Sequence, residues 1–273
     1  MKAAILIAAM VVGCSQQGAP EANDQSSRAV SGDNVLRGAH ERASAPSAKP
    51  FSVEEENDLY NFSYSWPVEG AAVPELAAKF TKEMNDARAE LIADAKADRD
   101  GRRKAGFDYL PHETQGHYET AGQSDRLLSL EYSLYGFTGG AHGSTASGAF
   151  LWDRAQARQI QIQDLLQSGA SWVGAIRQPF CVLLDREREE RRGEPVDKSD
   201  MFGNCPDYKE VTLLLGDEDK NGRFDHIHVI ADQYVAGPYA EGPYEISLPI
   251  TAAMIGRLKP EFQSSFEPKP PVK

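Results

Sequence analysis

The chain has few basic residues, few cysteines and few long apolar runs, and these shortages narrow the class of protein that it represents. Lys and Arg total 29 against 41 Asp and Glu, so the formal net charge is −12 over 273 residues. This charge argues against nucleic acid as a partner, because phosphates demand a basic surface, and it favours a cationic partner instead. After residue 12 no apolar run approaches the roughly 20 residues that cross a bilayer core.

Residues 1–13 have the features of a short signal peptide. Lys2 forms a minimal positive region, and an unbroken apolar run leads from it to Gly13 and Cys14. That run is too short to span a membrane but suits a cleaved leader. The cysteine at the cut site resembles a bacterial lipobox, in which Cys14 is lipidated (by palmitate, for example) and begins the mature protein. An ordinary secretory signal with an incidental cysteine is the alternative.

The segment that follows, residues 14–50, is expected to be a flexible tether. It is rich in Gln, Ser, Ala, Gly and Pro, so it buries too little apolar surface to offset the entropy of ordering. Several acyl chains on one cysteine anchor a protein stably. Because Ser15 rather than Asp follows Cys14, we expect attachment to the bacterial outer membrane, facing the periplasm or the cell surface.

Cys181 and Cys205 remain once Cys14 carries lipid. An even pair of cysteines in an oxidising compartment is most simply a disulfide. The bridge would hold the charged segment 185–200 against the folded body. A metal centre or a catalytic thiol would need a third ligand or a nearby histidine, which the spacing does not supply.

Folded sequence is expected from residue 51 onwards. Alternating aromatic residues predict a half-buried strand over 59–67. Apolar residues at three- and four-residue spacing after Pro74 predict a long amphipathic helix that ends near Gly101 or Gly106. Further strands are predicted at 116–121, 126–137, 144–152, 209–215, 226–231 and 244–248, and helices at 171–192 and 251–258. Such blocks predict an α+β fold whose antiparallel sheets each pack with a long helix.

The most unusual local sequence is Gly139-Gly140-Ala141-His142-Gly143-Ser144. One interpretation makes His142 a general base beside a nucleophilic Ser144. Adjacent residues of an extended chain point to opposite faces, however, and no orienting acid is identifiable. A tight turn in which glycine supplies positive φ is the favoured interpretation.

The segment 217–225 matches the front of a calcium loop, with Asp217, Asp219, Asn221 and Asp225 as oxygen donors. The twelfth position is His228 instead of Glu, and β-like segments flank the run. A solvated hairpin turn carrying Asn221-Gly222 is therefore favoured, and calcium is the weaker alternative. His226 and His228 share one face of a predicted strand and would supply half of a zinc site, although ordinary sheet residues have the same spacing.

Two segments together resemble a known pair of bacterial extracytoplasmic domains. Gly-Gly-Ala-His-Gly at 139–143 closes an alternating strand, and Tyr-Val-Ala-Gly-Pro-Tyr-Ala-Glu-Gly at 234–242 leads into Glu-Ile-Ser-Leu-Pro at 245–249. This order is similar to that of a PdaC-like N-terminal domain, here residues 51–143, followed by an RsiV-like C-terminal domain of unknown function, here residues 144–260. Residues 261–273 are left as a Pro-rich tail. The resemblance implies two related α+β subdomains.

The family that carries this resemblance has branches with different roles. In one branch the module is the sensor part of an anti-sigma factor that binds lysozyme, and in another it precedes a peptidoglycan deacetylase domain. This sequence shows neither an anti-sigma segment behind a transmembrane helix nor anything that resembles the deacetylase domain. Lysozyme sensing therefore does not carry over directly, although an acidic module that binds a basic envelope enzyme agrees with the charge.

We therefore expect a lipid-anchored module of the cell envelope that binds a lysozyme-like protein or a peptidoglycan-related ligand, without catalysis and without a cofactor. The residues expected to form its ligand site or a structural motif are Gly139, Gly140, His142, Gly143, Tyr239, Glu241 and Gly242. No catalytic residue is assigned. A cell-wall hydrolase that uses His142 and a purely structural envelope lipoprotein are the alternatives.

Overall fold

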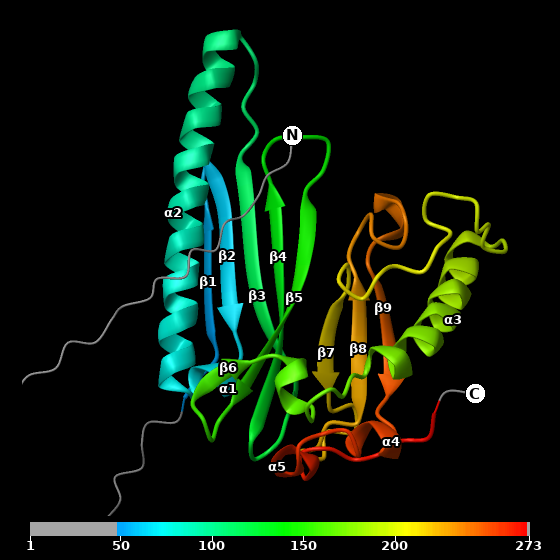
Figure 1. Cartoon of the computed structure of the whole chain (residues 1–273). Helices are drawn as coiled ribbons and strands as arrows, with labels where there is room; N and C mark the ends of the chain where they lie inside the picture. The colour runs from blue at the N-terminus through cyan, green and yellow to red at the C-terminus, as the bar shows by residue number, and fades with distance from the viewer. Residues whose placement is uncertain (1–47, 272–273) are drawn as a thin grey trace, which may run out of the picture. The chain divides into compact units, whose positions relative to one another are not determined.

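Residues 48–271 are described by a computed structural model, in which two sheets each pack with one long helix (Figure 1). The leader, the lipidation site Cys14 and nearly all of the expected tether lie outside the described residues. Within the described range, no helix has both the length and the apolar character needed to cross a bilayer. The expected α+β class is confirmed.

The first sheet has six strands in sequence order. They are β1 (Phe51–Glu56), β2 (Tyr60–Trp66), β3 (His112–Gln123), β4 (Leu127–Phe137), β5 (Ser144–Asp153) and β6 (Arg158–Ile160). All neighbours are antiparallel except β2 and β3, which are parallel because the long helix between them returns the chain to the end where β2 began. The sheet extends past residue 143, where the sequence placed the boundary between the two subdomains.

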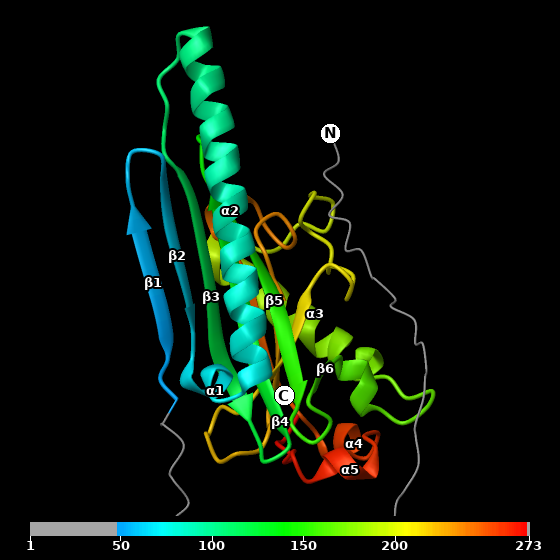
Figure 2. The ribbon, with the colours of Figure 1, turned by 90° about the vertical axis from the view of Figure 1, so that its left-hand side faces the viewer.

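The helix α2 (Pro74–Ala105) covers one face of this sheet, as Figure 2 shows. Pro74 occupies the first turn, where its missing N–H costs nothing, and the helix ends at Gly106, whose φ of +77° suits glycine. Leu76 and Phe80 are fully buried, and the Phe80 ring lies 4.1 Å from that of Tyr118 in β3. The predicted aromatic stripe is thus the core beneath α2, which the short helix α1 (Val68–Ala71) precedes.

The second sheet has three antiparallel strands, β7 (Thr212–Gly216), β8 (His226–Ala231) and β9 (Tyr244–Pro249), which pack against α3 (Val173–Arg192). The buried face of α3 presents Ile176, Phe180 and Leu184 to the same apolar cluster as Val229 and Ile246. The 3₁₀ helix η1 (Ile162–Leu165) lies between β6 and α3, and η2 (Tyr239–Glu241) lies between β8 and β9. Each sheet therefore packs against its own long helix, and the second core also takes in Leu127, Leu151 and Ile160 of the first sheet.

The predicted disulfide is confirmed. Cys181 and Cys205 are bonded, with their Cα atoms 5.5 Å apart. Beside the bridge, the fully buried guanidinium of Arg188 donates to the carbonyl oxygens of Ala236 at 2.8 Å and Asn204 at 3.1 Å. Arg188 is therefore buried although it lies in the charged segment 185–200, because two otherwise irregular stretches of chain, at Asn204 and Ala236, meet on it.

The C-terminal segment does not behave as the Pro-rich tail that its composition suggests. The short helix α4 (Ala252–Ile255) lies within the helix predicted at 251–258, and α5 (Pro260–Gln263) then extends into the predicted tail. Phe262 and Phe266 are 3% and 4% exposed and belong to the second core, and Phe266 bridges to Phe224 at the start of β8. The reason is that two phenylalanines bury enough apolar surface to fix a segment whose prolines already limit its freedom.

Candidate functional site

The structure brings together the two motifs that the sequence singled out. His142, in the turn between β4 and β5, stacks on Tyr239 with ring centroids 3.8 Å apart. Its Nδ1 lies 2.8 Å from the carbonyl oxygen of Gly143. Because a carbonyl oxygen only accepts, Nδ1 carries the proton. In the neutral ring Nε2 then accepts from the Tyr234 hydroxyl, which lies 3.4 Å away.

Glycines fix the shape of both motifs. A Cβ on Gly143 would lie 2.4 Å from the ring of Tyr135, and Gly242 has a φ of +71°, which other residues rarely adopt. Gly139 also has positive φ, and its carbonyl oxygen accepts from Arg102 of α2 at 3.1 Å. Gly140, which lies between Gly139 and Gly143 in the turn, is exposed. The glycines therefore serve backbone geometry, which agrees with the favoured tight-turn interpretation.

Glu241 anchors the second motif to α3. Its carboxylate accepts from Nε and Nη2 of Arg192, each at 2.9 Å, and from the Tyr244 hydroxyl. Burial raises the pKa of Glu241, but the hydrogen bonds from Arg192 and Tyr244 outweigh it and hold the pKa below its usual value. Burial, followed by the Glu241 charge, raises the pKa of Tyr244 to about 12. Glu241 is therefore a structural residue whose oxygens are already occupied.

The hydrolase alternative requires a hydrogen-bonded chain of nucleophile, base and acid. Among residues 48–271, His142 makes side-chain hydrogen bonds to Gly143 and Tyr234, and to neither Ser144 nor a carboxylate. The ring of His142 is instead occupied by stacking on Tyr239. The arrangement supports a local structural role for His142 more directly than proton transfer.

Sequence reasoning missed the face of the first sheet opposite α2, which the second sheet covers over part of β4 and β5 and which is open between β1, β2 and β3. Pairing places Glu56 beside Asn61 and Asn61 beside Glu113, while Glu119 pairs with Glu131. Since alternate residues share a face, five carboxylates lie on this side of the sheet, and we call them the acidic face. They belong to Glu54, Glu56, Glu113, Glu119 and Glu131.

Negative charges lie close together on the acidic face, and this affects the pKa of Glu131. Burial, followed by the charges of Glu245, Glu119 and Asp232, raises the pKa of Glu131 above its usual value. His117 is the one basic side chain among them, and its Nε2 lies 2.8 Å from Glu119. Between β1, β2 and β3 the face is hollowed by about 490 Å³. The hollow is lined by Glu54, Glu55, Glu56, Asn61, Phe62, Ser63, Glu113 and Gln115.

Tyr135 joins this face to the motif residues. It lies on β4 opposite Gln115 of β3 and contacts Gly143. Burial, and after it the charge of Glu113 and the neighbouring Tyr239, raises the pKa of Tyr135. Tyr234 beyond it is 55% exposed. The acidic face therefore has an aromatic border on the side of the predicted motifs.

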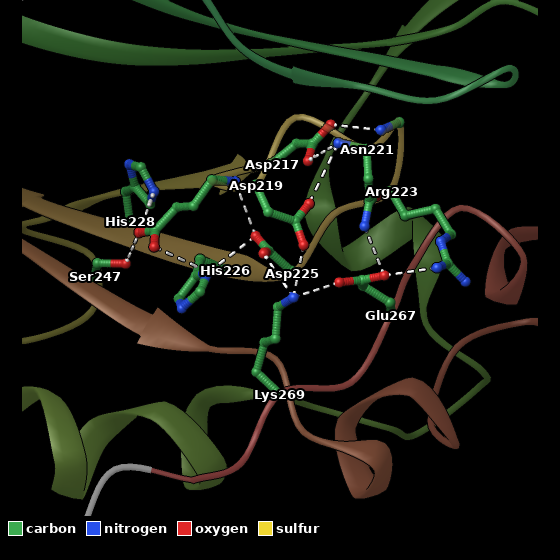
Figure 3. Close-up of polar contacts among 12 residues, drawn as sticks. Asp217, Asp219, Asn221, Arg223, Asp225, His226, His228, Ser247, Glu267 and Lys269 are labelled. Carbon is green, nitrogen blue, oxygen red and sulfur yellow. Dashed lines mark hydrogen bonds and ion pairs between the residues drawn. The ribbon is translucent and has the colours of Figure 1, made fainter.

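The segment 217–225 is the predicted β7–β8 hairpin, shown in Figure 3. The expectation of a solvated turn is wrong in part, because Asp217 and Asp225 are 8% and 1% exposed. Their oxygens turn inward to accept N–H groups of Asn221 and Glu218. Lys269 from the C-terminal segment lies 2.8 Å from Asp219.

The histidine pair lies as predicted on one face of β8. Both rings face Glu218, at 3.3 Å from His226 and 3.4 Å from His228. Within the described part of the chain, the group with metal-ligand spacing is Asp219, Asp225 and Glu267, which contains no histidine. The half zinc site thus finds no further ligands there.

Comparison with known proteins gives one family match. Residues 53–145 match a family described as Deacetylase PdaC, which supports the PdaC-like interpretation of the N-terminal domain. No curated protein sequence matches the chain. The RsiV-like interpretation of the C-terminal domain and the lipoprotein anchor stay predictions.

Two solved structures are similar to the chain. A DUF3298 family member from Bacteroides fragilis is 16% identical, with a TM-score of 0.49, and the alignment covers 80% of this chain and 95% of that one. A DUF3298 family protein from Pseudomonas aeruginosa is 17% identical, with a TM-score of 0.48 and coverages of 82% and 98%.

Proposed function

We propose that the chain is a lipid-anchored, non-catalytic module of the bacterial cell envelope that binds a cationic protein on its acidic face. The observation that carries the proposal is the gathering of five glutamates on the face of the first sheet opposite α2, three of them (Glu54, Glu56 and Glu113) around the open hollow between β1, β2 and β3. Burial, and after it the charges of Glu245, Glu119 and Asp232, raises the pKa of Glu131, so negative charge is crowded at this end of the face. A basic partner would relieve that crowding on docking.

The surroundings of the face favour a protein over a glycan as the partner. Peptidoglycan-derived fragments carry carboxylates of their own, which the acidic face would repel. The border of Tyr135, Tyr234 and Tyr239 instead suits a protein interface, where tyrosine is enriched. The leader and Cys14 support the envelope location, and the net charge of −12 supports a basic partner.

The experiment is a calorimetric titration of the protein with lysozyme as a cationic envelope probe. The test variant replaces Glu54, Glu56 and Glu113 by Gln, and a matched control replaces Glu90, Asp94 and Asp100, all exposed on α2, by their amides. We expect saturable binding that weakens about tenfold or more in the test variant, since each charge near an interface contributes about 0.5–1 kcal/mol. The control should bind as the unmodified protein does.

Three results would count against the proposal. Equal weakening of binding in the test and control variants would mean that the net charge of the protein, and not the acidic face, determines the affinity. Saturable binding of peptidoglycan fragments in place of lysozyme would assign the module to a glycan. Release of acetate from peptidoglycan would indicate a deacetylase, as the description of the matched family suggests. Release of sugar would indicate the hydrolase alternative.

A further inference from the structure

The loop between β7 and β8 spaces its polar side chains as the first part of a calcium-binding loop does. Asp217, Asp219 and Asn221 alternate, Gly222 follows with a φ of +85°, and Asp225 comes after it. The loop folds round Asp217, whose carboxylate accepts the N–H groups of Asn221 at 3.1 Å and Gly222 at 2.9 Å. Polar turns without an ion share this pattern, so the spacing alone assigns no site.

Asp225 supplies an independent indication of a ligand. The residue is 1% exposed, and its Oδ1 is occupied by the N–H of Glu218 at 3.0 Å and by His226 at 2.9 Å. Its Oδ2 accepts no hydrogen bond and points into the group of side chains drawn in Figure 3. A buried carboxylate oxygen in this condition costs free energy unless a cation satisfies it. The nearest cation is the ammonium of Lys269, whose Nζ lies 3.4 Å from this Oδ2.

Glu267 provides the carboxylate that the loop itself lacks. The twelfth position of a calcium loop carries a bidentate Glu, and here that position is His228. Glu267 comes from the C-terminal segment, and one of its oxygens lies within 4.8 Å of ligand oxygens of both Asp219 and Asp225. Asn221 donates to it at 2.8 Å, and its side chain is only 12% exposed. The missing ligand is therefore supplied from a distant part of the sequence.

The ammonium of Lys269 lies among the carboxylates of Asp219, Asp225 and Glu267. It lies 2.8 Å from Asp219 and also contacts Glu267, and Figure 3 shows it between them. A primary ammonium on a flexible stem that is 29% exposed is able to turn out towards solvent. Once it leaves, the carboxylates of Asp219, Asp225 and Glu267, which offer oxygens within 4.8 Å of one another, keep the guanidinium of Arg223 beside them, which pairs with Glu267 at 2.7 Å. The remaining negative charge suits a divalent ion.

We propose that this hairpin loop and Glu267 form a calcium site, from which the ammonium of Lys269 is displaced when the ion binds. Asp217, Asp219, Asn221 and Asp225 supply oxygens from the loop, and Glu267 takes the part of the twelfth-position glutamate. Calcium accepts six to eight oxygen ligands in irregular geometry, so a set drawn from two segments is sufficient. Binding would fasten the C-terminal segment to the hairpin more tightly than Lys269 does.

The experiment is a calorimetric titration of the full, chelator-treated chain with calcium chloride, with magnesium chloride as the comparison ion. We expect a single site with a Kd of about 10⁻⁴ to 10⁻³ M, the range of extracellular calcium modules, and much weaker binding of magnesium. Lys269→Met should tighten calcium binding about tenfold, because the competing cation is gone. Glu267→Gln should weaken it by about the same factor.

Glu261→Gln is the matched control, since Glu261 lies exposed on the same segment, and it should leave the affinity unchanged. Asp225→Asn tests the buried ligand, with circular dichroism to show that the variant folds. Absence of calcium binding in both the unmodified chain and Lys269→Met would overturn the proposal. Binding that Glu267→Gln leaves intact, or that Lys269→Met weakens, would overturn it as well.

Discussion

The imidazole of His142 and the phenol ring of Tyr239 stack at 3.8 Å with an angle of 20° between their planes. The two residues lie on loops that follow β4 and β8, so this contact joins the end of one sheet to the end of the other. The hydroxyl of Tyr234 adds a second link at 3.4 Å from His142. Both loops are otherwise held separately, by Arg102 at Gly139 and by Arg192 at Glu241.

Breaking this stack is expected to loosen the loops without unfolding either sheet. His142→Ala and Tyr239→Ala should each lower the free energy of unfolding modestly, and a double-mutant cycle should give a coupling of about 0.5–1.5 kcal/mol, the usual value for an aromatic pair. Denaturant unfolding of the four proteins measures it. Additive effects of the two substitutions would mean that the rings merely lie near each other.

Replacing Glu241, which anchors the segment 234–242 to α3, should lower the free energy of unfolding more than breaking the ring stack does. Glu241→Gln leaves Arg192 without its charged partner and is expected to lower the free energy of unfolding by about 2 kcal/mol at neutral pH. Because the folded-state pKa of Glu241 is lowered, its contribution is present above the usual Glu pKa and disappears as pH falls through the lowered value. The variant and the unmodified protein should therefore converge in strong acid. Glu190→Gln, at an exposed position of α3, serves as the control.

The disulfide is expected to stabilise the second subdomain. Replacing Cys181 and Cys205, which are 24 residues apart in sequence, by serine should lower the free energy of unfolding by about 2–4 kcal/mol. Thermal unfolding with and without a reductant provides the measurement, and the double variant should be insensitive to the reductant. An unmodified protein that is equally stable in both conditions would show that the bridge is energetically neutral.

Glu131 predicts a pH effect of the opposite sign. Its pKa is raised by burial and by neighbouring carboxylates, so the folded state binds this proton more tightly than the unfolded chain does. Stability therefore falls as pH rises from the ordinary value of 4.5 through the raised value. Glu131→Gln should be more stable than the unmodified protein at neutral pH and equally stable below the ordinary value. A variant that is less stable at neutral pH would contradict the stated crowding of charge.

Local patterns were sufficient for the elements that bury one face. Tyr60, Phe62, Tyr64 and Trp66 alternate because β2 lies under α2, and that alternation predicts the strand to within one residue at each end. The edge strand β1 was not predicted. Its last three residues are all glutamate, so apolar and polar residues do not alternate there, and its inner face is only partly buried. Charged residues on an edge also prevent pairing with other chains, so a local pattern of this kind is ambiguous.

The parts that sequence reasoning missed depend on contacts between distant residues. The acidic face exists because pairing aligns β1, β2 and β3, and nothing near Glu56 in the sequence indicates that Glu113 lies across from it by way of Asn61. Phe266 reaches Phe224, and Glu267 and Lys269 reach the hairpin, from a segment whose prolines suggested a tail. Motif spacing identified the loops at 139–143 and 234–242, but only the fold shows that they touch.

The salt dependence of lysozyme binding tests the central claim most directly. Affinity is measured at about 50 mM and about 200 mM salt for the unmodified protein and for the variant that replaces Glu54, Glu56 and Glu113 by Gln. We predict that the unmodified protein loses about tenfold in affinity over this range, because exposed charges are screened, and that the variant binds weakly at both concentrations. Affinity that does not depend on salt, or the same salt dependence in the variant, would contradict docking on the acidic face.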